Sequence, residues 1–337
     1  MRLIKPSYEI IEQGPGLQGI YDIIEKCGKV SYKSEPKGGE TAKKFVEARA
    51  KEGHGAVLEF GTVYLKLPAS GVSFDTIFAY EFYAHNKYSK VRTEWGVYYV
   101  TTNYRVLVEN NRLDDLKYLC EPTEYHEKRY AVKFITDIGV GREFLRHRTM
   151  SMVQESTRYV NYSKEKFGEQ CTFIIPPWID LPECEDVTYW DNDWVNTKTN
   201  KILCSGKNTR VSEWLFALDW AETRYIKLTQ DWSYMGEVDE SETAPWLAQQ
   251  ARSVLPLATK TEFVLCGFKD AWVHFFCLRS DIAATGKPHP QAQELANPLR
   301  DVFIEKHFIT EDELKHDALA LYEAAYNWGR PEKEVKQ

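Results

Sequence analysis

The chain has 337 residues, enough to bury a full hydrophobic core as one large domain or two. Hydrophobic residues make up 43% of it and aromatic residues 14%, values typical of a globular protein. The net charge of −7 argues against a protein that binds nucleic acid over its whole surface, so basic residues matter locally. The amino terminus lacks an apolar signal region and no apolar run could span a membrane, which predicts a cytoplasmic protein without membrane association.

Cysteine and histidine spacing argues against metal and disulfide sites. The seven cysteines are scattered and include no Cys-x-x-Cys pair, so reduced thiols are the simplest interpretation. The histidines also lack a ligand spacing such as His-x-x-x-His, and we therefore predict no metal site.

The first elements predicted are two helices and a strand. From about Leu17 to Cys27 apolar residues share one helical face, and Gly28 follows as a stop. A second helix is predicted from Thr41 to Lys51, with Thr41 as its N-cap. Residues 63–67 alternate between apolar and polar side chains, which predicts a half-buried strand.

Residues 70–128 are predicted to combine helices and strands. A helix is expected from Ser73 to Lys87, and one or two strands between Trp95 and Glu109. A short helix is predicted from Asn111 to Cys120.

A strand from Ala131 to Ile138 leads to the most polar stretch of the chain. Gly139 and Gly141 would allow a tight turn before Glu143.

Residues 146–158 gather three Arg, one His, two Ser, a Gln and a Glu, a composition that favours anions. Guanidinium groups match phosphate bidentately and stay charged at any working pH. If the start is extended, Arg146 and Arg148 share a face opposite His147. If the later part is helical, Gln154 and Arg158 lie on one face. A surface ion-pair patch could have the same composition, which alone leaves both interpretations open.

The second half alternates irregular sequence with amphipathic helices. Residues 160–212 are polar and weakly periodic, which predicts a functional or mobile excursion rather than core. Ser212 is predicted as the N-cap of a helix whose apolar stripe reaches Leu228. A further helix is predicted to begin near Thr243, with Pro245 in its first turn.

The carboxyl-terminal part is predicted to be largely core. Thr261 to Leu278 is almost continuously apolar, and Glu311 to Trp328 reads as a final amphipathic helix. The charged tail from Arg330 to Gln337 is expected to fray. Helices and alternating strands occur without a regular βαβ rhythm, so we predict an α+β fold with a mixed or antiparallel sheet flanked by helices.

The polar stretch also resembles a family motif. Arg146-His147-Arg148, then seven residues, Ser156 and Arg158-Tyr159 resemble the signature of the flavin-dependent thymidylate synthase family. Further segments resemble family elements: Lys29–Tyr32, the histidine segment Gly53–Phe60, Arg252–Leu257 as Arg-x-Val-Leu-Pro-Leu, Leu278-Arg279 as Leu-Arg, and Pro288–Leu295 as a His-Ala-Gln tail. Phe60 replaces a family histidine, and either His289 or Gln291 takes the place of the tail histidine.

This resemblance implies a single domain, residues 1–337, with insertions at about 70–128 and 160–212. It implies a methyltransferase that converts dUMP to dTMP, with methylenetetrahydrofolate as carbon donor and FAD, reduced by NADPH, as hydride source. It also implies a homotetramer with active sites between subunits.

Site roles follow from the same resemblance. It implies that Arg279 is the catalytic residue and that dUMP is bound by Glu143, Arg146, Gln154, Glu155, Ser156, Thr157, Arg158, Arg252 and Arg279. It implies that FAD is bound by His54, Arg146, His147, Arg148, Gln154 and His274. Phe268 and His274 stand where the family usually has asparagines that bind FAD. Ser31 could approach the cofactor, although an ordinary loop serine fits the sequence as well.

Two other functions fit the same residues. One is a related flavoenzyme that modifies another pyrimidine nucleotide, such as dCMP. The other is a non-catalytic protein that binds a nucleotide or phosphate through the arginine cluster. A nucleic-acid binder fits poorly, because the chain is acidic and lacks a basic stripe.

Overall fold

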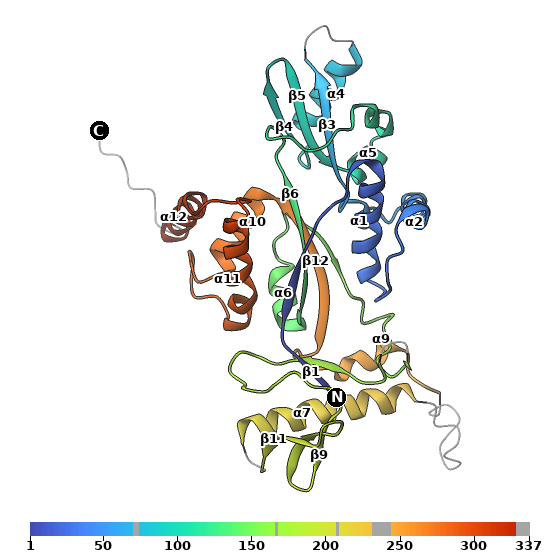
Figure 1. The fold of residues 1–337 in the computed structure, drawn as a ribbon, viewed down its shortest axis with the longest axis vertical. Coiled ribbons are helices and arrows are strands. Elements are labelled where there is room, and N and C mark those ends of the chain that lie inside the picture. Colours follow the sequence, from blue (N-terminus) through green and yellow to red (C-terminus); the bar gives the residue numbers. More distant parts are fainter. Residues whose placement is uncertain (70–73, 166–167, 207–208, 231–243, 328–337) are drawn as a thin grey trace. The chain divides into compact units, whose positions relative to one another are not determined.

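A computed structural model describes residues 1–69, 74–165, 168–206, 209–230 and 244–327. The chain divides into two compact units, unit 1 (Met1–Cys266) and unit 2 (Gly267–Gln337). The described elements mix helices with antiparallel strand pairs, which confirms the predicted α+β class (Figure 1). The single domain with two insertions stays a prediction.

Unit 1 contains all the strands that pair and most of the helices. Its strands are β1 (Arg2–Ile4), β2 (Ser7–Ile11), β3 (Thr62–Pro68), β4 (Lys90–Glu94), β5 (Val97–Asn103), β6 (Arg129–Asp137), β7 (Ser151–Gln154), β8 (Thr172–Ile174), β9 (Val187–Trp190), β10 (Asp193–Asn196), β11 (Lys201–Ser205) and β12 (Lys260–Phe268), the last of which ends just past the unit boundary. Its helices are α1 (Gly16–Val30), α2 (Gly39–Lys51), α3 (Gly55–Leu58), α4 (Phe74–His85), α5 (Tyr104–Glu109), the 3₁₀ helix η1 (Leu113–Tyr118), α6 (Ile138–Phe144), α7 (Arg210–Thr229), α9 (Ala248–Ala251) and the 3₁₀ helix η4 (Arg252–Val254).

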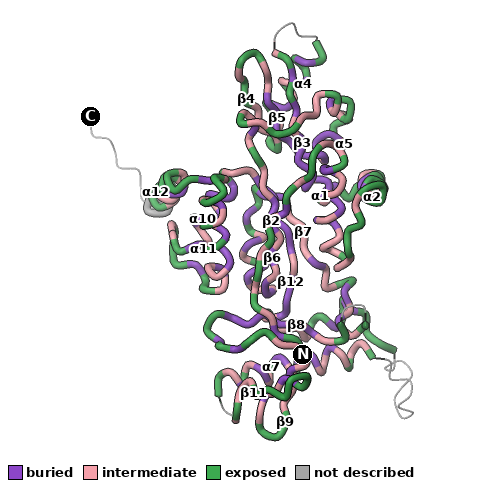
Figure 2. The backbone as a smooth tube through the Cα atoms, viewed as in Figure 1, coloured by how far each residue is buried: buried purple, intermediate pink, exposed green. Residues whose placement is uncertain are grey.

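A four-stranded sheet with the order β2-β6-β12-β7 carries the polar stretch. β2 pairs antiparallel with β6, and β7 pairs antiparallel with β12, with Gln154 opposite Phe263. The rings of Phe134, Phe144 and Phe263 pack together beneath it. Figure 2 shows buried residues along these strands. The predicted strand from Ala131 to Ile138 is confirmed as β6, one residue shorter at its end.

In the sheet β3-β5-β4, strand β3 has the alternation of apolar and polar side chains expected of a strand that buries one face. The apolar residues at 63, 65 and 67 are fully buried, which confirms the predicted strand. The predicted helix from Ser73 to Lys87 is confirmed as α4. The segment from Trp95 to Glu109 is only partly strand, because Asn103 caps a helix: its side chain accepts a hydrogen bond from Val106 N, and α5 begins there.

The first two helices are confirmed, but their ends were predicted wrongly. α1 continues through Gly28 to Val30. A Cβ at Gly28 would lie 2.8 Å from the Phe45 ring, so this glycine permits close packing of α1 against α2 and does not stop the helix. α2 begins at Gly39 with Gly38 as its N-cap, so Thr41 lies inside the helix.

The prediction of a non-core excursion at residues 160–212 was wrong. Strands β9, β10 and β11 form an antiparallel sheet, and Trp194 is fully buried in a cluster with α7. Its indole Nε1 donates to Ser212 Oγ at 3.1 Å. Ser212 therefore lies within α7, and Thr209 caps that helix by accepting from Ser212 N. Strands of four or five residues are too short to show clear periodicity.

The predicted start of the next helix, near Thr243 with Pro245 in its first turn, was also wrong as far as the described residues show. Thr243 lies outside the described residues, and Pro245 precedes the helix instead of entering it. The first helical residue is Ala248, and after one turn the backbone tightens into η4.

The described part of unit 2 contains three helices after the end of β12: α10 (Lys269–Arg279), α11 (Pro290–Glu305) and α12 (Glu311–Asn327). Trp272, Phe276 and Phe303 pack together at its centre. The apolar run from Thr261 to Leu278 is therefore a strand followed by a helix. The predicted final helix is confirmed as α12, while residues 328–337 lie outside the described part. No described helix has the length and apolarity required to cross a membrane.

Candidate functional site

The polar stretch begins at a short helix, and not at the predicted tight turn. Asp137 caps α6 by accepting a hydrogen bond from Val140 N at 2.8 Å. Gly139 and Gly141 lie within this helix. A Cβ at Gly141 would lie 3.2 Å from the Thr261 methyl carbon, so this glycine lets α6 pack closely on β12.

Residues Arg146–Arg148 form a turn between α6 and β7. Two backbone hydrogen bonds form this turn: His147 N donates to Phe144 O, and Arg148 N donates to Arg146 O. The segment is therefore not extended. Arg146 and Arg148 are nevertheless both exposed while His147 is buried, which is the separation that an extended segment would also give. Within the described part of the chain, the guanidinium groups of Arg142, Arg146 and Arg148 form no ion pair. These cations are therefore available to an anion.

The later part of the stretch is not helical. Gln154 ends strand β7, and Ser156 to Tyr159 form a turn closed by the Tyr159 N to Ser156 O hydrogen bond. Ser156 Oγ accepts from Arg158 N at 3.3 Å, which braces the same turn. The Arg158 side chain is exposed, with its guanidinium 5.6 Å from the centre of the Tyr159 ring.

A cleft of about 660 Å³ lies beside this turn. It is lined by residues from four segments: Ile138, Arg142, Gln154, Glu155, Thr157, Gln249, Arg252, Ser253, Leu255, Pro256, Leu257 and Thr261. Arg252 Nη1 donates to Thr157 Oγ1 at 3.1 Å, although the two residues are 95 positions apart. Gln154 Nε2 donates to Thr261 Oγ1 at 3.0 Å. The lining of the cleft thus combines hydrogen-bond donors with apolar side chains.

Backbone hydrogen bonds hold in place the segment that carries Arg252. Ile138 N, at the start of α6, donates to Leu257 O at 3.0 Å and to Thr259 O at 3.1 Å. This ties the segment after η4 to the helix that precedes the motif. Arg252 therefore reaches the motif of its own chain.

A network of buried charges lies behind the motif turn. Lys260 Nζ is 2.8 Å from Glu155 Oε2 and also forms an ion pair with Glu262, whose other oxygen is 2.6 Å from Lys133 Nζ. Burial raises the pKa of Glu262, but Lys260 and Lys133 outweigh it, so the pKa lies below its ordinary value. Tyr162 donates its hydroxyl to Glu155 Oε1 at 3.4 Å.

The loop after α1 lies against the same turn. Ser31 O accepts from Ser156 N at 3.1 Å, and the rings of Tyr32 and Tyr159 are 5.9 Å apart. Burial, and then the nearby Lys260, lower the pKa of Lys33 in this loop. Ser31 is therefore adjacent to the motif, while its approach to a cofactor stays a prediction.

Two predicted residues of unit 1, His54 and Glu143, are not among the described residues that line the cleft. His54 is exposed just before α3, with Nδ1 3.3 Å from Glu52 Oε2. Glu143 is half-buried in α6. Arg129 joins the His54 segment to the motif strand, because it donates to Glu59 O at 2.9 Å and to Ser151 Oγ at 3.0 Å.

The remaining predicted residues belong to unit 2. Arg279 is half-buried in the last turn of α10. His274 lies on the same helix, with Nδ1 3.6 Å from Asp317 Oδ2. His289 caps α11 by accepting from Gln291 N.

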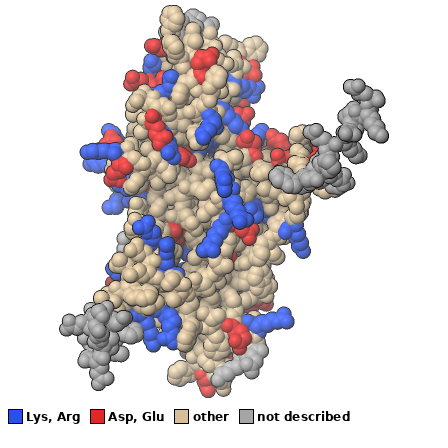
Figure 3. Space-filling view, turned by 180° about the vertical axis from the view of Figure 1, so that it is seen from behind, with Lys and Arg blue, Asp and Glu red and all other residues tan. Residues whose placement is uncertain are grey.

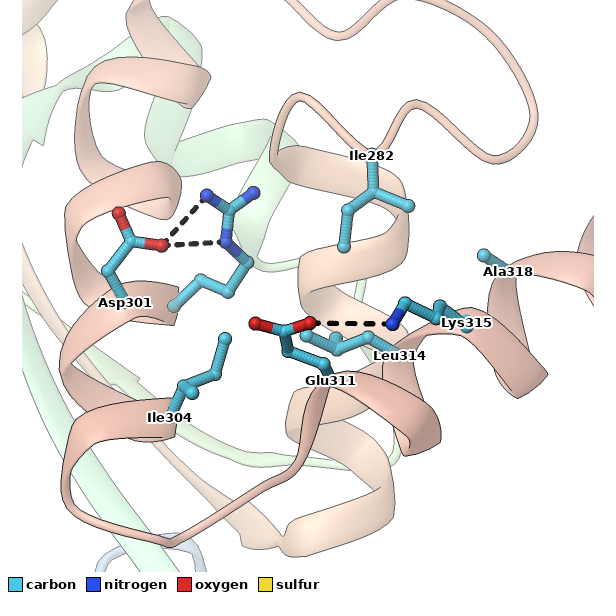
Figure 4. Close-up of a pocket in the computed structure, with 8 residues that line it drawn as sticks. Ile282, Asp301, Ile304, Glu311, Leu314, Lys315 and Ala318 are labelled. Carbon is cyan, nitrogen blue, oxygen red and sulfur yellow. Dashed lines mark hydrogen bonds and ion pairs between the residues drawn. The ribbon is translucent and has the colours of Figure 1, made fainter.

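A second pocket, of about 460 Å³, lies within unit 2 (Figure 4). Its apolar lining comes from Ile282, Ile304, Leu314 and Ala318. Its cations are already paired, because Arg300 binds Asp281 and Asp301, and Lys315 is 3.4 Å from Glu311. The pocket holds none of the predicted site residues, so the cleft in unit 1 is the better candidate site.

The described residues contain no group of three or more His, Cys, Asp or Glu side chains that could hold a metal ion. All seven cysteines are free thiols. On the face shown in Figure 3, Lys and Arg side chains gather in separate groups with uncharged surface between them.

Sequence reasoning found Gln154, Glu155, Thr157 and Arg252 among the residues that line the cleft. It missed Arg142, Gln249, Ser253 and Thr261. The only sequence signal for Arg142 was its place beside Glu143. Thr261 had none, since it meets Gln154 only through the pairing of β7 with β12.

A family model matches an extended part of the chain. The model of a family described as thymidylate synthase complementing protein matches residues 122–307, more than half of the chain. A flavin-dependent thymidylate synthase from Synechocystis sp. (strain ATCC 27184 / PCC 6803 / Kazusa) is 38% identical over 80 residues, 23% of this chain. The matched part spans 35% of that relative's length.

Two solved structures resemble the chain distantly. A UMP/dUMP methylase, PolB from Streptomyces cacaoi bound with 5-Br dUMP, aligns with 15% identity over 96% of this chain and 98% of that chain, with a TM-score of 0.40. Thymidylate synthase X from Helicobacter pylori with FAD and dUMP aligns with 18% identity over 56% of this chain and 74% of that chain, with a TM-score of 0.33. Similarity this low adds no argument about function.

Proposed function

Because the chain belongs to the thymidylate synthase complementing protein family, the flavin-dependent thymidylate synthases that its motif indicated, we propose that it methylates dUMP to dTMP. In this proposal methylenetetrahydrofolate donates the carbon, and NADPH reduces the bound FAD. The protein would work in the cytoplasm as a homotetramer with its sites between subunits.

The observation that carries the proposal is the contact between Arg252 and Thr157. It brings the Arg-x-Val-Leu-Pro-Leu segment and the arginine motif to one cleft, although they are distant in sequence. The volume of about 660 Å³ lies within the range of small-molecule sites. The guanidinium, hydroxyl and amide donors of its lining suit a phosphate and a pyrimidine, and the apolar side chains suit a ring or sugar.

In the proposed complex, each nucleotide-binding residue has a role set by its chemistry. Arg146, Arg158 and Arg252 would neutralise the phosphate, and Ser156 would donate a hydroxyl hydrogen bond to it. Gln154 Nε2 is held by Thr261, which leaves its amide oxygen as an acceptor toward the uracil. Glu143, Glu155 and Thr157 complete the predicted set.

The residues proposed for FAD have suitable chemistry. Arg146 and Arg148 are exposed cations without an ion-pair partner among the described residues, as binding a pyrophosphate requires. His54, His147, Gln154 and His274 are the other proposed contacts. When bound and reduced, FAD supplies the hydride for the reaction.

Arg279 is proposed as the catalytic residue. A guanidinium beside the uracil would stabilise negative charge at N3 and the carbonyl oxygen, which makes C5 nucleophilic. Because Arg279 lies in the last turn of α10, its backbone is held by that helix. Ser156 is the less favoured nucleophile, since no base contacts it among the described residues.

The test combines an absorption spectrum with an activity assay. Purified protein should carry the absorption bands of FAD, bleach with NADPH, and release tritium from [5-³H]dUMP. Arg279→Ala should keep the flavin and lose tritium release, whereas the exposed Arg92→Ala, on β4, should behave as wild type. Normal turnover by Arg279→Ala would refute the assignment.

Two alternatives remain open to the same assays. Phe268 and His274, which replace the usual asparagines, favour a test of other pyrimidine nucleotides, so dCMP should be compared with dUMP as substrate. A non-catalytic nucleotide-binding protein would bind dUMP and carry no FAD.

A further inference from the structure

The strand residue Lys260 reaches the motif turn from behind the cleft. Lys260 and Glu155 are each only 5% exposed, and Lys260 Nζ is 2.8 Å from Glu155 Oε2. Glu155 lines the cleft, whereas Lys260 is not among the described residues that line it. Lys260 can therefore affect a bound ligand only through other residues.

Glu155 is fixed at both carboxylate oxygens and at its backbone. Tyr162 donates to Oε1, Lys260 to Oε2, and Glu155 N donates to Glu262 O at 2.7 Å. Its neighbours Gln154 and Thr157 make the hydrogen bonds that shape the cleft. Any shift of Glu155 would therefore move the groups that face the ligand.

Loss of the Lys260 side chain would affect its two carboxylate partners, Glu155 and Glu262, unequally. Glu262 would keep Lys133, at 2.6 Å, as its partner. Among the described residues, Glu155 would keep only a neutral hydroxyl, from Tyr162, within hydrogen-bond reach, with Lys33 as a nearby cation that does not bond to it directly. Because a buried carboxylate without a directly bonded cation is costly, Glu155 would turn toward solvent and distort the turn.

We infer that Lys260 is a positioning residue, whose ion pair with Glu155 holds residues 154–158 in the geometry that binds a pyrimidine nucleotide. The inference rests on the proposed function. It treats the Glu155 carboxylate as an anchor for the turn and not as a direct contact to the nucleotide.

The experiment uses full-length Lys260→Met, Lys133→Met and the double variant Lys260→Met/Glu155→Gln. Titration calorimetry gives the Kd for dUMP, tritium release gives KM and kcat, and thermal unfolding checks the fold. Lys260→Met should raise Kd and KM by about tenfold or more, with a smaller fall in kcat at saturating dUMP. The control Lys133→Met should stay within about twofold of wild type.

The double variant separates positioning from direct contact. The amide that Glu155→Gln introduces carries no charge, and its oxygen can still accept from Tyr162, so the double variant should bind dUMP more tightly than Lys260→Met alone. Binding no tighter than Lys260→Met would overturn the inference, since that is the result expected of a carboxylate that touches the nucleotide.

Two further results keep the test decisive. If Lys260→Met does not fold, Glu155→Gln alone should weaken dUMP binding severalfold, and unchanged binding would overturn the inference. Failure of the wild type to bind dUMP would count against the proposed function. Wild-type binding together with an unchanged Lys260→Met would count against Lys260 only.

Discussion

Arg252 uses one of its N–H groups on Thr157 and is otherwise exposed at the edge of the cleft. A guanidinium has five donors, so the others can bind an anion. Loss of a hydrogen bond to a charged group costs about 1.5–3 kcal/mol, which corresponds to roughly 10- to 100-fold in Kd. Arg252→Ala should therefore weaken dUMP binding to this extent in a calorimetric titration.

The conservative variant sharpens that prediction. Arg252→Lys keeps the charge but loses the bidentate fork, so its Kd should lie between those of wild type and Arg252→Ala. Equal affinity of all three proteins would show that Arg252 does not bind the nucleotide.

His126 gives a prediction about pH. Its Nδ1 accepts from Thr123 N at 3.1 Å and its Nε2 is 3.1 Å from Leu65 O, an arrangement that fits a neutral ring with the proton on Nε2. That tautomer cannot take a proton from Cys120 Sγ, 3.9 Å from Nε2, so the pair is not a catalytic dyad. Burial lowers the pKa of His126 below 6.5.

The sign of the pH effect follows from that lowered pKa. As the pH falls below 6.5 the unfolded chain binds a proton at His126 before the folded protein does, so the free energy of unfolding decreases. Well above pH 6.5, where the ring is neutral in both states, this group contributes no pH dependence. Denaturant midpoints at pH 7.5 and 5.5 should therefore differ less in His126→Gln than in wild type or in exposed His85→Gln. An unchanged pH dependence in His126→Gln would contradict this.

At the residue scale, the sequence predicted cleft residues where a local motif marked them. The Arg146–Tyr159 spacing pointed to Gln154 and Thr157, and the segment after α9 pointed to Arg252. Residues whose role depends on strand register or on a distant loop gave no such signal. Lys260 is an example, because only the pairing of β12 with the motif segment brings it to Glu155.

Gly19 shows how a helix is fixed by close backbone contact. A Cβ at Gly19 would lie 1.8 Å from Gly14 O, a backbone atom that cannot move aside as a side chain can. Gly19→Ala should therefore force the start of α1 away from the preceding segment. We expect a loss of about 1–3 kcal/mol in the free energy of unfolding, measured by denaturant titration.

Gly14→Ala is the matched control. A Cβ there would meet only Gly19 Cα, at 3.5 Å, which is an ordinary van der Waals contact. This variant should unfold within about 0.5 kcal/mol of wild type. Equal stability of the two variants would show that the contact is not a constraint on the fold.

At the element scale, long segments with clear periodicity were predicted correctly, and their ends were not. α1 and α7 were found because each buries a stripe of apolar side chains, which includes Ile20 and Ile24 in α1 and Leu215 and Leu218 in α7. Their ends depend on single hydrogen bonds, such as that from Ser212 N to Thr209, which several nearby residues could have supplied. The short strands β9–β11 were not predicted, because tertiary packing around Trp194, and not a local sequence pattern, defines them.

At the scale of the whole molecule, the proposed residues are divided between the two units. Arg252 belongs to unit 1 and contacts its own motif, while Arg279 belongs to unit 2. The proposed homotetramer has its sites between subunits, so the two arginines of one site need not come from the same chain. The family resemblance implies that Arg252 contacts the phosphate in the site of a neighbouring subunit, which stays a prediction.

Mixing two impaired variants, assayed at a dUMP concentration well below the Kd of Arg252→Ala, would decide this. If different subunits supply Arg252 and Arg279, then Arg252→Ala and Arg279→Ala chains, unfolded together and refolded at equal amounts, should form some sites with both arginines intact. Random assembly would restore about a quarter of the wild-type tritium release from [5-³H]dUMP. At this dUMP concentration each variant refolded alone should release little tritium, and wild type treated in the same way gives the reference. If one chain supplies both residues, every site lacks an arginine, and the refolded mixture will show no more activity than its parents.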